Sequence, residues 1–151
     1  MGEIASFRIY PGLGNYEHSN GRRGIYFTVR IFKTLAELRK AAIEGGTQHK
    51  SASYYRNALG VCQTWKETEH LRGKHKYTTR DAGQILLCEK HASPDVVAHE
   101  CAHAANYWFR RIKSIDLKRP IVVKRQEEEL LCYAIGEMTN QVYLGLKRAG
   151  I

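Results

Sequence analysis

The sequence lacks the features that would assign it to a fibrous, disordered or membrane-spanning class of protein. It has three prolines and thirteen glycines in 151 residues, too few for a collagen-like or low-complexity chain. Its apolar runs, such as residues 85–88 and 121–123, are far too short to cross a bilayer. We expect no secretory signal, because no basic region followed by an apolar stretch opens the chain. With 43% hydrophobic residues, the composition predicts one globular domain over residues 1–151.

Paired cysteine motifs and glycosylation signals are also missing. Cys62, Cys88, Cys101 and Cys132 form no C-x-x-C pair, and no N-x-S/T sequence occurs. The cysteines lie in apolar or helical contexts, which is typical of buried free thiols in a reducing compartment. The sequence therefore predicts a cytoplasmic protein without disulfides, although the even cysteine count leaves disulfides open.

Positive charge is concentrated in the first half of the chain. The net charge is +9, and residues 1–80 carry 14 Lys/Arg against 6 Asp/Glu, whereas residues 81–151 carry 10 against 9. A basic N-terminal half is suited to an acidic partner, namely nucleic acid, an acidic protein or anionic lipid. The alternative is an ordinary solvated basic face, because no nucleic-acid recognition module accompanies the charge.

Turn residues and apolar spacing predict an α+β fold. In the basic half (1–80) we expect strands at 7–10 and 24–32, a helix capped by Thr34 and ended by Gly45-Gly46, and a second helix within 51–70. We expect a loop over 71–81, a strand over 84–89, a helix from Ser93-Pro94-Asp95 to about Arg111, and a last helix over 124–148. The two C-terminal helices should pack on a small mixed or antiparallel sheet, with residues 81–151 forming a metal site.

The helix that starts at Ser93 contains His99-Glu100-Cys101-Ala102-His103, an H-E-x-x-H motif. Histidines four residues apart lie one turn apart on one helix face, so both rings reach one metal ion. Glu100 is offset by about 100°, which places it beside the ion as a base for a metal-activated water. Two surface histidines beside an unrelated glutamate are the alternative interpretation.

A catalytic zinc ion requires a third protein ligand, and the acidic start of the last helix is a candidate source. Glu129, Cys132 and Gly136 share a helix face of small residues, which would let this helix approach the histidine helix. Glu129 is therefore the predicted third ligand, with Glu128 as the next candidate. Carboxylates at Glu127–Glu129 also have a simpler explanation, because the helix dipole favours them in a first turn.

The H-E-C-A-H segment followed by E-E-x-L-C-Y-A-I-G resembles the zincin metallopeptidases of the gluzincin type over roughly residues 84–143. It looks especially like small zincin-like proteins encoded by bacteriophages and prophages. The resemblance implies a zinc-dependent hydrolase of peptide bonds, with Gly83–Cys88 as the strand edge that pairs with a peptide substrate. The alternative is an ordinary core strand, and both could hold on its two edges. The sequence departs from the family at Tyr133, where many gluzincins carry an Asp or Asn that orients a metal-binding histidine.

Two other functions stay open on the sequence alone. One is a non-catalytic binding protein on a zincin scaffold, which uses the basic half for a phage-type host interaction or for nucleic acid. The other is a DNA-associated protease resembling the SprT-like proteins. We rank it lower because those proteins usually take a third histidine as the metal ligand.

Overall fold

The computed structural model describes residues 2–12, 24–46, 52–66, 69–78, 80–113 and 125–151. Its centre is a four-stranded mixed sheet with the strand order β1-β2-β6-β3. The strands are β1 (Glu3–Ile9), β2 (Tyr26–Phe32), β3 (Gly60–Thr64) and β6 (Asp81–Cys88). The β1–β2 and β3–β6 pairs are antiparallel and the β2–β6 pair is parallel. The α+β class predicted from the sequence is therefore confirmed.

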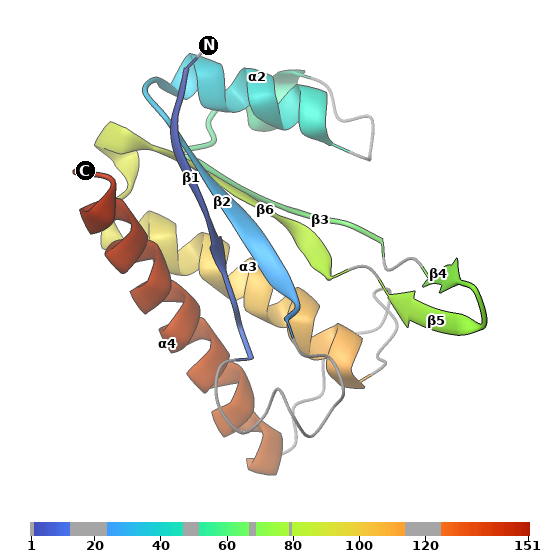
Figure 1. The fold of residues 1–151 in the computed structure, drawn as a ribbon. Helices are drawn as coiled ribbons and strands as arrows, with labels where there is room; N and C mark the ends of the chain where they lie inside the picture. The colour runs from blue at the N-terminus through green and yellow to red at the C-terminus, as the bar shows by residue number, and fades with distance from the viewer. Residues whose placement is uncertain (1, 13–23, 47–51, 67–68, 79, 114–124) are drawn as a thin grey trace.

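Helices cover both faces of this sheet (Figure 1). The larger core lies under α3 (Pro94–Lys113) and α4 (Arg125–Arg148), and it includes Phe27, Ile85 and Phe109. The smaller core lies under α2 (Leu35–Gly45) and the 3-10 helix η1 (Ala52–Tyr55) on the other face. Alternate strand residues point to opposite faces, so β2, β3 and β6 contribute to both cores, whereas β1 contributes to the larger core.

The first strands and the first helix follow the sequence predictions. β1 and β2 form the expected antiparallel pair. Thr34 caps α2 through a capping box. The Thr34 hydroxyl accepts a hydrogen bond from the backbone N–H of Glu37, and the Glu37 side chain accepts one from the backbone N–H of Thr34. The α2 helix ends at Gly45, as its paired glycines predicted.

The prediction of a helix within residues 51–70 was wrong. The described part of this stretch contains the single turn of η1, the strand β3 and the start of a further strand at Glu69. The loop predicted over 71–81 was also wrong in part, because β4 (Glu69–Arg72) and β5 (His75–Thr78) form an antiparallel hairpin there. The apolar residues of 51–70 have helical spacing, but Gly60 interrupts that pattern. Gly60 is the first residue of β3, and it pairs with Leu87 of β6.

The two C-terminal helices have close to their predicted bounds. Pro94 begins α3, and the Ser93 carbonyl accepts the first helical hydrogen bond, from Val97 N–H. The α4 helix runs to Arg148, and Gly150 follows with φ of 78°, a left-handed conformation that glycine adopts readily. Along the described residues, none of the helices combines the length and the apolarity that a membrane crossing demands.

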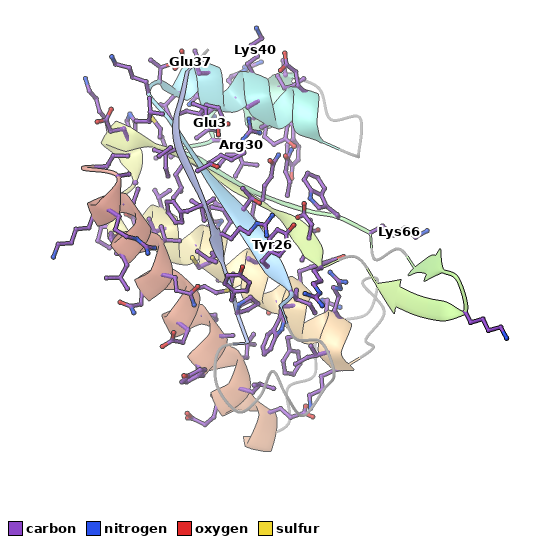
Figure 2. All side chains as sticks on the ribbon, viewed as in Figure 1. Glu3, Tyr26, Arg30, Glu37, Lys40 and Lys66 are labelled. Atoms are coloured by element: carbon purple, nitrogen blue, oxygen red, sulfur yellow. The ribbon has the colours of Figure 1, made fainter. Side chains whose placement is uncertain are left out.

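A chain of polar side chains crosses the sheet on the α2 face. Gln63 Nε2 donates to the carbonyl of Ala42 (2.7 Å) and Gln84 Nε2 donates to Gln63 Oε1 (2.7 Å). Arg30 donates to Gln84 Oε1 (3.2 Å) and pairs with Glu3 (2.7 Å), and both residues are labelled in Figure 2. These bonds satisfy the buried glutamines and connect all four strands to the end of α2.

Candidate functional site

The two motif histidines converge on one point in space. His99 and His103 lie one turn apart on the exposed side of α3, and their Nε2 atoms are 3.1 Å apart. Two nitrogens bound to one tetrahedral zinc ion at about 2.0–2.1 Å lie roughly 3.3 Å from each other. The rings lie nearly perpendicular, at 79°, with their centroids 4.7 Å apart. The pair therefore fits two adjacent ligand positions of a zinc ion.

The opposite side of α3 is anchored in the core. Val97, Cys101, Ala104 and Ala105 are completely buried, and Trp108 is 2% exposed. This burial fixes the rotation of α3 about its axis and keeps the two histidines on its exposed side. Burial and, to a smaller extent, His99 lower the pKa of His103. Both effects favour the neutral imidazole, which is the form that binds a metal.

Glu100 lies between the histidines and the sheet. It is 6% exposed, and its carboxylate accepts a hydrogen bond from the backbone N–H of Cys62 in β3. Burial raises the pKa of Glu100, while His99 and the Cys62 N–H act in the opposite direction. A carboxylate that is held firmly and accepts protons more readily than usual is suited to act as a general base.

The backbone of β3 contributes to the site, and the sequence analysis missed it. A Cβ atom at Gly60 would lie 2.9 Å from Val96 Cγ1 and 3.0 Å from Glu100 Cγ, so a glycine here lets α3 and Glu100 approach the strand closely. The isolated glycine within the supposed helix of residues 51–70 was the available signal. It marks both the strand and the contact with Glu100.

The prediction that Gly83–Cys88 forms a free peptide-binding edge was wrong. These residues belong to β6, which is paired on one side with β2 and on the other with β3. All of them are buried. β6 is thus a central strand, and its continuous apolar run Ile85-Leu86-Leu87 reflects packing on both faces. The strand at the edge of this sheet beside the histidine helix is β3.

The structure does not bring Glu129 or Glu128 to the histidine pair. The α4 helix runs antiparallel to α3, since Glu127 pairs with Lys113 (3.2 Å) and Thr139 hydrogen-bonds Cys101. The glutamates therefore lie level with the C-terminal end of α3. Because Cys101 faces α4 and lies about 200° around the helix from His99, the histidines point away from α4.

The face of small residues that was predicted to approach α3 is instead exposed. It consists of Glu129, Cys132 and Gly136, all on the solvent side of α4. Among the side chains that the structure describes, no third His, Cys, Asp or Glu completes a metal-binding group with His99 and His103.

Comparison with protein-family models, with curated proteins and with solved structures gives no match. The zincin resemblance therefore depends on the H-E-x-x-H motif. The geometry of its His99, Glu100 and His103 is the observation from which a function can be argued.

Proposed function

We propose that this protein is a zinc-dependent metallopeptidase in which His99 and His103 are two of the protein ligands of the ion and Glu100 is the general base. The observation that carries the proposal is the 3.1 Å approach of the two Nε2 atoms beside a buried carboxylate. When bound, zinc lowers the pKa of a water molecule and polarises the carbonyl group that the water attacks.

The roles of the protein's own residues follow from their positions. His99 and His103 present their Nε2 atoms to the ion, and the buried side of α3 keeps them in place. The Glu100 carboxylate accepts the proton of the attacking water and delivers it to the nitrogen of the departing amine. The Cys62 N–H orients that carboxylate during both transfers. Glu129 is left out of the proposed ligand set because it lies on the far side of α4.

The decisive variant is Glu100→Gln. A glutamine side-chain oxygen can still accept the Cys62 N–H bond, so the fold and zinc binding should be retained, but the amide cannot act as a base. We expect cleavage of a peptide library, followed by mass spectrometry, to fall by about 10²–10⁴-fold. Turnover at the wild-type rate by Glu100→Gln would show that the proposed mechanism is wrong.

Metal content tests the ligand set separately. We expect elemental analysis to find zinc in the wild-type protein and in Glu129→Ala, and to find it lost in His99→Ala and His103→Ala. Zinc retained in both histidine variants would refute the proposed site. Loss of zinc in Glu129→Ala would reinstate the ligand predicted from the sequence. A zinc-free wild-type protein of normal stability would favour a non-catalytic binding protein.

A further inference from the structure

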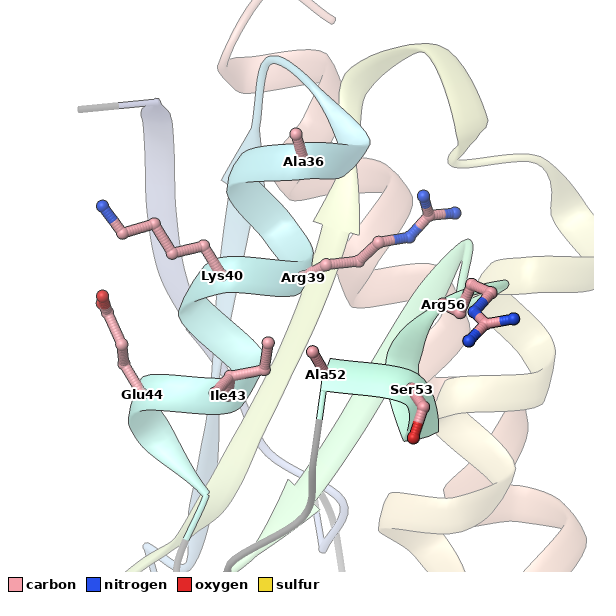
Figure 3. Close-up of a pocket in the computed structure, with 8 residues that line it drawn as sticks. All are labelled: Ala36, Arg39, Lys40, Ile43, Glu44, Ala52, Ser53 and Arg56. Atoms are coloured by element: carbon pink, nitrogen blue, oxygen red, sulfur yellow. The ribbon is translucent and has the colours of Figure 1, made fainter.

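A groove lies on the opposite side of the sheet from the histidine pair, between α2 and η1 (Figure 3). Its volume is about 590 Å³, within the range of ordinary ligand pockets. Arg39, Lys40, Ile43 and Glu44 line it from α2, and Arg56 lines it just beyond η1. The proposed zinc chemistry makes no use of this region.

The charges of the groove are predominantly positive. Three cations, Arg39, Lys40 and Arg56, line it against one carboxylate, Glu44. Arg39 Nε and Nη2 both donate to the carbonyl of Ala58, at 3.2 and 3.1 Å, so its guanidinium is already held in one position. Figure 3 shows the guanidinium groups of Arg39 and Arg56 on one side, and Lys40 and Glu44 on the other. A preorganised cation loses little conformational entropy when an anion binds.

Between these two sides the groove is apolar. Ile43 is 41% exposed, and it lies next to Ala52, which comes from η1 (Figure 3). An exposed aliphatic surface flanked by cations matches a ligand that has aliphatic side chains flanked by carboxylates. Nucleic acid is a poorer match, because none of the described side chains that line the groove is aromatic and able to stack on a base.

We propose that the groove between α2 and η1 binds an acidic peptide segment of a partner protein. Carboxylates of the peptide pair with Arg39 and Arg56 on one side and with Lys40 on the other, while an aliphatic side chain packs on Ile43. The proposal is independent of zinc and of peptide hydrolysis, because the groove lies on the other face of the sheet.

The test is fluorescence anisotropy with a short labelled peptide of alternating Glu and Leu, at low salt. Arg56→Gln should weaken binding by about three- to fivefold, because it removes one exposed ion pair. Glu44→Gln should tighten binding by about twofold, because it removes the one repelling carboxylate. Lys66→Gln is the matched control: it removes the same charge at the far end of β3 (Figure 2) and should leave the affinity unchanged.

The two comparison probes are a peptide with Gln in place of Glu and a single-stranded oligo-dT. We expect neither to show binding that depends on Arg56. Equal losses in Arg56→Gln and Lys66→Gln would overturn the proposal, because they would show only a response to net charge. Tighter binding of oligo-dT than of the acidic peptide, lost in Arg56→Gln, would overturn it in favour of nucleic acid. Mass spectrometry confirms that the peptide stays intact, so neither result depends on the zinc mechanism.

Discussion

The four cysteines occupy very different environments, which predicts very different reactivities. Cys132 is exposed on α4, Cys88 and Cys101 are buried, and Cys62 is partly buried. Burial also raises the pKa of the Cys62 thiol, which leaves less of the reactive thiolate. We expect the native protein to present one fast-reacting thiol to the reagent DTNB at pH about 8, and the unfolded protein to present four.

Cys132→Ser supplies the control for this experiment. The variant should lose the fast phase while its total thiol count in denaturant falls by one. A fast phase that persists in Cys132→Ser would show that a second thiol is accessible. The packing of α3 against the sheet or against α4 would then differ from the structure.

The sequence predicts the relative positions of site residues that belong to the same helix. It does not predict the positions of site residues that depend on how two helices pack together. The spacing of His99 and His103 determines their proximity once the segment is helical. The position of Glu129 depends instead on the direction of α4 and on which side of it faces α3. The small residues beside Glu129 suggested that this side of α4 approaches α3 closely. The buried side of α4 is instead the opposite one, which carries the apolar residues Leu130, Ala134 and Met138.

At the scale of an element, α4 contains two glycines with opposite roles. Gly136 is exposed and a Cβ atom there would meet nothing within 4 Å, whereas a Cβ atom at Gly145 would overlap the ring of Phe7 in β1. Replacing Gly136 by Ala should raise the free energy of unfolding by about 0.5–1 kcal/mol, because alanine restricts the unfolded chain and favours helix. Replacing Gly145 by Ala should lower it by about 1–3 kcal/mol through overpacking.

Urea denaturation of the two variants measures this difference within a single helix. The gain in helix propensity is the same at both positions, so the contact with Phe7 accounts for the opposite signs. Stabilisation by Gly145→Ala would mean that α4 does not lie against β1 as the structure has it. The paired hydrogen bonds between Gln141 and the backbone of Tyr10, at 2.8 and 2.9 Å, independently support that contact.

The helices were predictable as elements because their signals are local. Thr34 with Glu37, Ser93 with Pro94, and Gly150 mark ends that neighbouring residues determine. β3 has only Gly60 as a local signal, because it becomes a strand by pairing with β6, about twenty residues later in the chain. The parallel β2–β6 pair also joins distant segments, so the order of the sheet could not be derived from local patterns.

At the scale of the whole molecule, α3 connects the candidate metal site to the core. It packs against β3, β6 and α4, while its exposed side carries the histidine pair. An ion that binds this pair in the folded protein therefore stabilises the entire domain. At a free zinc concentration about 100 times the Kd, the stabilisation is about 2.7 kcal/mol. For a chain of this length, that corresponds to a rise in Tm of roughly 5–10 °C.

This rise in Tm should appear when zinc is added to chelator-treated wild-type protein and thermal unfolding is followed by circular dichroism. His103→Ala should not show it, because one imidazole cannot hold the ion alone. His91→Ala is the matched control, since His91 lies in the 3-10 helix η2 (Glu89–His91), outside the pair, and should keep the full shift. An equal shift in His103→Ala would mean that zinc binds elsewhere on the chain. No shift in the wild-type protein would mean that the 3.1 Å contact is a hydrogen bond between two surface histidines.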